Sequence, residues 1–386
     1  MKKTLVALSV LAAAANVNAG EIYATDASKV SLKGEVDAYV AMSDTEKATL
    51  KNTSDNGKQV RTKLDPNAQV WAKVQLDAEH KMNEDLTVFG SFEIESATGA
   101  TAAAADNSAK FDDVYLGVKS DSWAVAIGEV GDVADSMDAL EKGDITNEGK
   151  YFGSAGGHRT ESKGHGLVFK ADLADNLLFV ADMHTESNED VENTIGASLD
   201  WTINDMFTVG GSFVSGEQAK DVDYRVGGVS ASMTAGGFMV AATYAQFEGV
   251  NSFGLFGSSV KGDVTITGGA DANGNDLTNS SEEKYAYTNG DAYGVAVQYT
   301  IDKTRLYATY DVLSIDEFTK SGADANGDTT NIVVGVDYAL MDNLTVFTEY
   351  QTAETSNDFS GASTDNSGSG AGLDADVYMV GAYYTF

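Results

Sequence analysis

Residues 30–42 read VSLKGEVDAYVAM, and apolar side chains alternate along this stretch with mostly polar ones. Val36 and Val40 fall on one face, while Glu35 and Asp37 fall on the other. A period of two is that of an extended strand, whose successive side chains point to opposite faces. The stretch therefore predicts a β-strand with one apolar and one polar face.

The same alternation recurs along the chain and predicts sixteen strands in all. After 30–42 they lie near residues 68–79, 86–95, 111–119, 123–130, 164–173, 177–186, 193–203, 206–216, 224–235, 238–248, 292–301, 304–315, 330–340, 344–353 and 376–386. Segment 111–119 is the least regular, because Asp112 and Asp113 fall on opposite faces of it.

Short and long connections follow one another in turn. The short ones, such as Asn204-Asp205 and Asp302-Lys303, consist largely of Asn, Asp and Gly, which tolerate the positive φ of tight turns. The long ones are rich in Gly, Ser, Asn and Asp and lie near 43–67, 97–110, 131–163, 249–291, 316–329 and 354–375. An even strand number with short turns at one end and long loops at the other is typical of a transmembrane β-barrel. The predicted fold is all-β, a single-domain, sixteen-stranded antiparallel barrel, with Tyr244, Tyr299, Tyr338, Tyr378 and Tyr384 as candidates for its aromatic girdles.

The composition excludes several other classes of protein. The chain of 386 residues carries 25 Lys and Arg against 59 Asp and Glu, a net charge of -34. Nucleic acid is excluded as a partner, because phosphate binding needs a concentrated basic face. The absence of Cys removes disulfide scaffolds, cysteine-type zinc sites and thiol catalysis.

The N-terminus has the pattern of an export signal. Lys2 and Lys3 precede an apolar stretch over 5–15, and Val17-Asn18-Ala19 has the small residues of a cleavage site. The apolar stretch is shorter than the ~20 residues that a bilayer-spanning helix needs. We expect residues 1–19 to be a cleaved signal peptide and 20–386 to be the mature barrel.

Three segments resemble the general, trimeric porins of the Gram-negative outer membrane. They are Gly20-Glu21-Ile22-Tyr23 followed by Lys29-Val30-Ser31-Leu32-Lys33-Gly34, then Asp85-Leu86-Thr87-Val88-Phe89-Gly90, and finally Val380-Gly381-Ala382-Tyr383-Tyr384-Thr385-Phe386. The resemblance implies short periplasmic turns, long extracellular loops and passive diffusion of small hydrophilic solutes and ions, with no enzymatic step and no cofactor. It also implies a homotrimer in contact with outer-membrane lipid and lipopolysaccharide, whose C-terminal Phe386 is read by the barrel-assembly machinery.

In that family the third long loop folds into the barrel and narrows it. The third long connection here is 131–163, and its acidic residues are Asp132, Asp135, Asp138, Glu141, Asp144 and Glu148. Carboxylates in a narrow aqueous passage attract cations, because low-dielectric walls focus their field. The alternative for these residues is a solvated acidic surface loop.

The resemblance also implies a basic cluster on the wall opposite this loop. Lys73 and Arg159 match basic positions of the family, but Glu35 and Asp112 stand where relatives carry Lys or Arg. The predicted pore wall consists of these four residues together with Lys33 and Asp37. Two acids in place of two bases predict a channel that prefers cations.

Other motifs are weaker. Asp271-Ala272-Asn273-Gly274-Asn275 with Glu282, and Asp324-Ala325-Asn326-Gly327-Asp328, have the spacing of calcium loops, but turn chemistry explains both and no metal site is predicted. The four His residues lack the spacing of a metalloprotease motif. Two alternative functions remain: a substrate-selective sugar channel, for which inward-facing Trp71 and Phe89 are too few to form a track, and a plugged outer-membrane barrel acting as adhesin or receptor.

Overall fold

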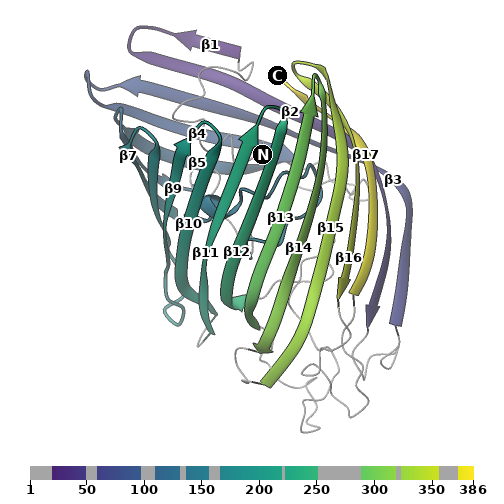
Figure 1. Ribbon diagram of the computed structural model, residues 1–386. Coiled ribbons are helices and arrows are strands. Elements are labelled where there is room, and N and C mark those ends of the chain that lie inside the picture. The colour runs from purple at the N-terminus through teal and green to yellow at the C-terminus, as the bar shows by residue number, and fades with distance from the viewer. Residues whose placement is uncertain are drawn as a thin grey trace.

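A computed structural model describes residues 20–48, 59–96, 109–130, 136–155, 166–219, 222–250, 288–318, 323–355 and 373–386. Strands β2 to β17 form a closed antiparallel barrel of sixteen strands, as predicted (Figure 1). Each of these strands pairs with the next along the chain, and β17 closes the ring by pairing with β2. Among the described residues, no helix is long and apolar enough to cross a membrane.

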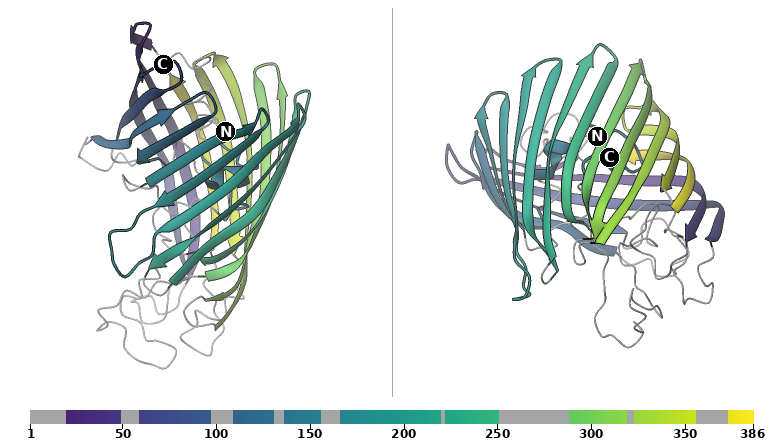
Figure 2. Two further views of the ribbon diagram at one scale, coloured as in Figure 1. Left: turned by 90° about the vertical axis from the view of Figure 1, so that its left-hand side faces the viewer. Right: turned by 60° about the horizontal axis from the view of Figure 1, so that its bottom comes forward.

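The strands vary in length around the barrel. Their bounds are β2 Ser28–Ala48, β3 Gln59–Lys81, β4 Thr87–Ser96, β5 Ala109–Lys119, β6 Trp123–Gly128, β7 Gly166–Ala174, β8 Leu177–His184, β9 Thr194–Asn204, β10 Phe207–Ala219, β11 Val222–Ala235, β12 Phe238–Val250, β13 Thr288–Ile301, β14 Thr304–Phe318, β15 Ala323–Met341, β16 Leu344–Thr355 and β17 Leu373–Thr385. The strands are tilted, and short turns join them in pairs at one end of the barrel (Figures 1 and 2).

A short extra strand, β1 (Gly20–Ala24), was not predicted. It folds back onto β2, with Gly20 opposite Leu32. Along β2, strand β17 ends with Thr385 opposite Glu35. Strand β1 therefore pairs with β2 next to the point at which the last strand of the barrel stops.

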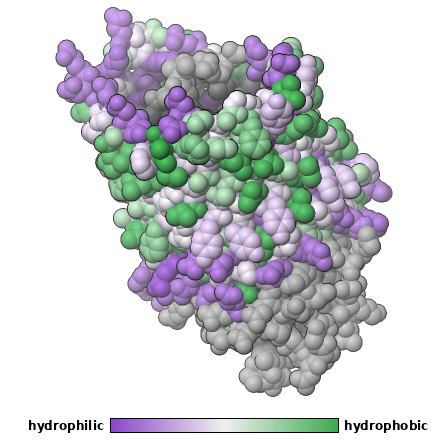
Figure 3. Space-filling model, viewed as in Figure 1, coloured by the Kyte–Doolittle hydropathy of each residue, from purple (hydrophilic) through white to green (hydrophobic). Residues whose placement is uncertain are grey.

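The two faces of each strand differ as the alternation predicts. On β2, Val40 is 45% exposed on the outer face, whereas Asp37 is 8% exposed on the inner one. On the face shown in Figure 3, apolar side chains form a belt across the barrel, with hydrophilic residues above and below it. The five tyrosines predicted for the girdles are all exposed, Tyr244, Tyr299, Tyr338, Tyr378 and Tyr384. An apolar belt edged by tyrosines is the surface that a bilayer covers.

Two predicted long loops have wrong bounds. Much of 43–67 is strand, because β2 continues to Ala48 and β3 begins at Gln59. Most of segment 316–329 is paired strand, because β14 continues to Phe318 and β15 begins at Ala323. Asp324 lies opposite Glu317, and Asp328 lies opposite Ser314. Ladder hydrogen bonds thus hold this Asn-, Asp- and Gly-rich segment extended, because context outweighs its low β-propensity.

The irregularity of 111–119 is a β-bulge. Asp113 has a φ of 49°, and the pairing of β5 with β4 shifts register between Ser91 and Glu93. An extra residue in one strand restores the alternation beyond it. Asp112 and Tyr115 therefore both lie on the inner face, although three positions separate them.

Candidate functional site

Residues 136–155 of the third long connection lie against the inner face of the barrel wall. They begin with the short 3-10 helix η1, Ser136–Leu140. The Asp182 carboxylate on β8 accepts the Ser136 N–H at 2.6 Å, and the Thr243 hydroxyl on β12 donates to the Leu140 carbonyl at 3.0 Å. The Lys142 ammonium lies 2.8 Å from the Asp200 carboxylate of β9. The loop thus follows the wall from β8 to β12.

The apolar side chains of this loop pack against strands β10 to β15. Met137 and Leu140 are buried in a cluster with Val214, Val226 and other residues of β10 to β14. Further along, Ile145 is fully buried in a second cluster that includes Val333 of β15. Burial of these groups favours docking through the hydrophobic effect.

The tip of the loop is held by a buried carboxylate, that of Glu349 on β16. It is 2% exposed and accepts the backbone N–H groups of Asn147 at 2.9 Å, Glu148 at 3.2 Å and Gly149. Gly149 is required here, because a Cβ atom would lie 2.7 Å from the Val333 side chain. A carboxylate that accepts several N–H groups makes strong charge-assisted hydrogen bonds.

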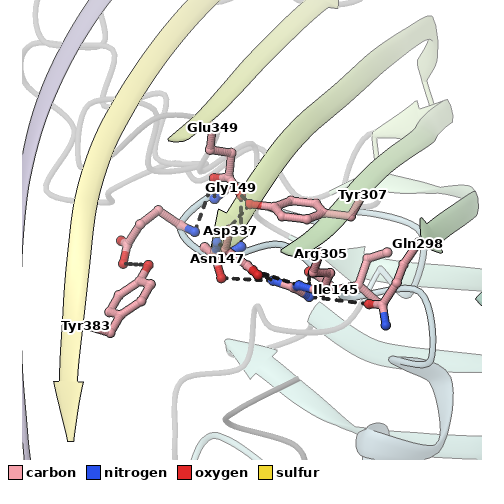
Figure 4. A network of polar contacts seen from close by, with 10 residues as sticks. Ile145, Asn147, Gly149, Gln298, Arg305, Tyr307, Asp337, Glu349 and Tyr383 are labelled. Carbon is pink, nitrogen blue, oxygen red and sulfur yellow. Dashed lines mark hydrogen bonds and ion pairs between the residues drawn. The ribbon is translucent and has the colours of Figure 1, made fainter. Parts of the chain in front are cut away.

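Arg305 of β14 completes this anchor (Figure 4). Its guanidinium donates to the Asp337 carboxylate at 2.7 Å, to the Ile145 carbonyl at 2.8 Å and to the Asn147 side-chain oxygen at 3.0 Å. The Tyr307 ring lies 4.4 Å below it, and the Tyr307 hydroxyl donates to Glu349 at 2.7 Å. The buried charges of Arg305, Asp337 and Glu349 are therefore paired or hydrogen-bonded.

A second buried carboxylate, that of Asp311 on β14, holds the loop backbone after the tip. Asp311 is fully buried and accepts the Phe152 N–H at 2.8 Å and the Asn331 amide at 3.1 Å. The same Asn331 amide donates to the Lys150 carbonyl at 2.8 Å. Burial lowers the pKa of Lys150 and raises that of the neighbouring Tyr151.

Of the six predicted loop acids, four lie in the described part of the chain. Glu148 accepts the hydroxyl hydrogen of Tyr383 on β17 at 2.7 Å, and Asp144 accepts that of Thr146 at 3.2 Å. Asp138 lies on η1 and Glu141 follows it, both partly exposed. Asp132 and Asp135 lie outside the described residues, as does Arg159 of the predicted wall.

The other predicted wall residues lie on β2, β3 and β5. Four lysines of this wall are each next to a carboxylate: Lys33 lies 3.7 Å from Asp77, Lys73 lies 3.0 Å from Glu93, Lys110 lies 2.9 Å from Asp112 and Lys119 lies 2.6 Å from Glu79. Lys110 also pairs with Glu95. Glu35 and Asp37 of β2 add negative charge to the same inner face, so acids offset the wall lysines.

The residues that hold the loop were not predicted from the sequence. Glu349, Asp311, Arg305 and Asp182 were visible only as polar residues on the inner face of predicted strands. Alternation places such residues inside the barrel, but it does not distinguish one that faces water from one that a loop covers. The spacing within the loop gives no signal of which strand it reaches.

Of the two calcium-like segments, 324–328 belongs to strand β15, and 271–282 lies outside the described residues. Asp328 accepts a hydrogen bond from Ser314 at 2.6 Å. No group of three or more His, Asp or Glu residues in the described ranges is arranged to hold a metal ion.

A closed sixteen-stranded barrel with an apolar belt outside and charged side chains within is a transmembrane barrel of the porin class. The model of the Gram-negative porin family matches residues 6–358. The chain belongs to that family, and it is an outer-membrane channel protein whose family and fold are those of non-enzymatic channels.

Solved porins share the fold at low sequence identity. The chain is similar to Salmonella typhi OmpF in complex with daunomycin, with 19% identity, 95% of this chain and 100% of that chain covered, and a TM-score of 0.62. Vibrio cholerae OmpT gives 18% identity, the same coverage and a TM-score of 0.60. A mutant Rh. blastica porin gives 13% identity, 92% and 100% coverage and a TM-score of 0.58. No curated protein sequence matches the chain.

Proposed function

We propose that this protein is a passive diffusion channel for small hydrophilic solutes and ions that prefers cations. The observation that carries the proposal is the charge of the inner wall, where each of Lys33, Lys73, Lys110 and Lys119 lies within 4 Å of a carboxylate. Further acids, Glu35 and Asp37, share that face. Paired lysines attract anions weakly, and the remaining carboxylates favour cations in a passage with low-dielectric walls.

We further propose that 131–163 forms the constriction. Residues 136–155 fill part of the interior along β8 to β17, which leaves the wall of β2 to β6 as the opposite side of the passage. Glu148 at the loop tip then contributes a carboxylate next to β17 and β2.

A homotrimer is the proposed assembly. One Vibrio cholerae OmpT structure is described as a trimer form. On this chain, the exposed outer-face tyrosines of the barrel strands belong to β12 to β17, whereas the described outer face of β2 to β6 carries no tyrosine and exposes mainly aliphatic residues, such as Val70 and Leu116. Girdle aromatics mark lipid headgroups, and β7 to β11 expose Phe169, Trp201, Phe207 and Phe213 in place of tyrosines, so we assign the more aliphatic arc of β2 to β6 to the subunit contacts.

The remaining parts of the proposal concern the two ends of the chain and the lipid around the barrel. Residues 1–19 direct export and are removed, lipid and lipopolysaccharide surround the apolar belt, and Phe386 is the signal for barrel assembly. Phe386 pairs with Gly34 through reciprocal backbone hydrogen bonds of 2.8 and 2.9 Å, so the terminal residue takes part in closing the ring.

The test is single-channel recording of the purified protein in a planar bilayer with a gradient of potassium chloride. Closure in three equal steps and a cation-directed reversal potential are expected. A reversal potential at zero or in the anion direction contradicts the preference for cations. Block by maltooligosaccharides at low concentration indicates a sugar channel instead, and a silent membrane with folded protein indicates a plugged barrel.

A further inference from the structure

Trp71 is a tryptophan of β3 that lies on the inner face of the barrel. Its alternation partners Val70 and Val74 are exposed on the outer face, at 60% and 39%, so the odd-numbered side chains of this segment point inward. Trp201 of β9, by contrast, is 46% exposed on the outer, lipid-facing side. A large aromatic ring on the wall of an aqueous passage is a surface on which a solute can stack.

The ring of Trp71 belongs to a row of aromatic and acidic side chains. Asp37 of β2 lies directly opposite Trp71, and Tyr383 of β17 lies directly opposite Asp37 on the other side. The row ends at the constriction loop, because the Tyr383 hydroxyl donates to Glu148 at 2.7 Å. One carboxylate thus stands between two rings, and a second stands at the end of the row.

Two further contacts of the Trp71 side chain involve Glu95 and Lys73. The indole N–H donates to the Glu95 carboxylate at 3.1 Å, which fixes the orientation of the ring. The Lys73 ammonium lies 5.3 Å from the ring centroid and 3.0 Å from Glu93. The ring therefore already contacts one alkylammonium group, that of Lys73, with which a passing cation competes.

We infer that the inward-facing ring of Trp71, with the Asp37 carboxylate beside it, is a docking site for organic ammonium ions passing through the channel. An ammonium with alkyl substituents gains cation–π attraction from the Trp71 ring and Coulomb attraction from Asp37. Tyr383 is 6% exposed and stacks on Phe347, so its ring packs the end of the row and does not face the solute. An inorganic cation of the same charge keeps its hydration shell and gains mainly the Coulomb part. This inference rests on the proposed function as an open, cation-preferring channel.

The experiment is a titration of the open channel with choline chloride at constant potassium chloride, with lithium chloride as the charge-matched inorganic control. Wild-type conductance is expected to fall along a saturating curve with choline and not with lithium. Trp71→Leu is expected to raise the half-blocking choline concentration about two- to fivefold, the effect of one exposed cation–π contact. Trp71→Phe keeps a ring and retains most of the block, and it replaces the leucine variant if that variant does not fold.

The matched control is Trp201→Leu, which removes the same side chain from the lipid-facing side and leaves the choline curve unchanged. The inference is overturned by a choline effect that is linear and equal to that of lithium, by a Trp71→Leu curve that matches wild type, or by an equal block from neutral glucose. In each of these outcomes the channel still conducts, so the proposed function stands. A protein that folds but does not conduct overturns both.

Discussion

The carboxylate of Glu349 on β16 accepts the backbone N–H of Asn147, a residue of the third long loop, at 2.9 Å. The same buried carboxylate accepts the next two N–H groups of that loop. A single side chain of the wall therefore satisfies three successive donors, which would otherwise be buried without partners. This arrangement makes Glu349 the residue on which the position of the loop tip depends most.

We expect Glu349→Gln to loosen the tip. The neutral amide loses the charge-assisted hydrogen bonds and turns an NH2 group toward backbone donors, at a cost of about 2–3 kcal/mol. Amide hydrogen exchange of 147–149 should accelerate by about 30- to 150-fold, the equivalent of that free energy, with noisier single-channel current. Glu354→Gln, at an exposed position of the same strand, is the control. Unchanged exchange at 147–149 would show that the tip is held by Arg305 and Asp311 alone.

A second prediction concerns the charge on the wall of β2 to β6, opposite the loop. Glu35 lies directly opposite Lys73. Glu35→Lys places two cations side by side and should reduce the ratio of potassium to chloride permeability about fivefold, the effect of roughly 1 kcal/mol of Coulomb energy. The reversal potential in a potassium chloride gradient measures it. Glu354→Lys makes the same charge change on the outer face, and an equal shift there would mean that net charge, not the lumen, sets selectivity.

The fold was predictable because a barrel repeats one simple pattern. Alternation of the kind seen at Val36, Asp37 and Val40 assigns each strand and its two faces, and closure needs only neighbours in order. The ends of strands were less predictable: Asp324 and Asp328 have turn chemistry, yet they pair with β14. Residues such as Asn, Asp and Gly permit a turn but do not require one. Whether they pair in a strand depends on the partner strand.

The candidate site was predictable only in its sequence position. The loop acids were identified, but Glu148 reaches Tyr383 across 235 residues and Asn147 reaches Glu349 across 202. Such contacts depend on how the loop crosses the barrel, which no local pattern encodes. The wall lysines show the same limit, since the cross-strand pair of Lys73 with Glu93 follows from the register between β3 and β4.

A third prediction tests the bulge in β5. Asp113 has a φ of 49°, a left-handed conformation that β-branched residues avoid and glycine adopts freely. Asp113→Val and Asp113→Gly both remove the carboxylate, so their difference isolates the backbone term. We expect the valine variant to be less stable than the glycine variant by about 1–2 kcal/mol. Urea unfolding from detergent micelles measures this, and equal midpoints would mean that the bulge relaxes.

A fourth prediction concerns pH and Glu129, which directly follows β6 and hydrogen-bonds with Asp112 of the inner wall. Burial, followed by the charge of Asp112 and a hydrogen bond with its carboxylate, raises the pKa of Glu129 above the ordinary value of 4.5, while Lys110 acts in the opposite direction. Glu129 therefore takes up its proton at a higher pH than an ordinary glutamate as the solution is acidified. Cation preference should begin to fall at a higher pH than the titration of ordinary glutamates would produce, and Glu129→Gln should remove this early phase. Reversal potentials at a series of pH values test it, with exposed Glu189→Gln as the control that keeps the phase.

The last prediction concerns closure of the barrel at Gly34 and Phe386. Their backbones exchange two hydrogen bonds, of 2.8 and 2.9 Å, and the Phe386 ring lies where a Cβ atom on Gly34 would stand. Gly34→Val must displace this ring, which we expect to destabilise the folded barrel by about 1–3 kcal/mol and to lower the yield of refolding. Gly90→Val, on β4, is the control, because the nearest atom to its added Cβ is 3.3 Å away. If the ring is the cause, Gly34→Val should cost little in a Phe386→Ala background, since a double-mutant cycle isolates the pairwise term. An equal cost in both backgrounds would place the effect in the β2 backbone and not in the terminal ring.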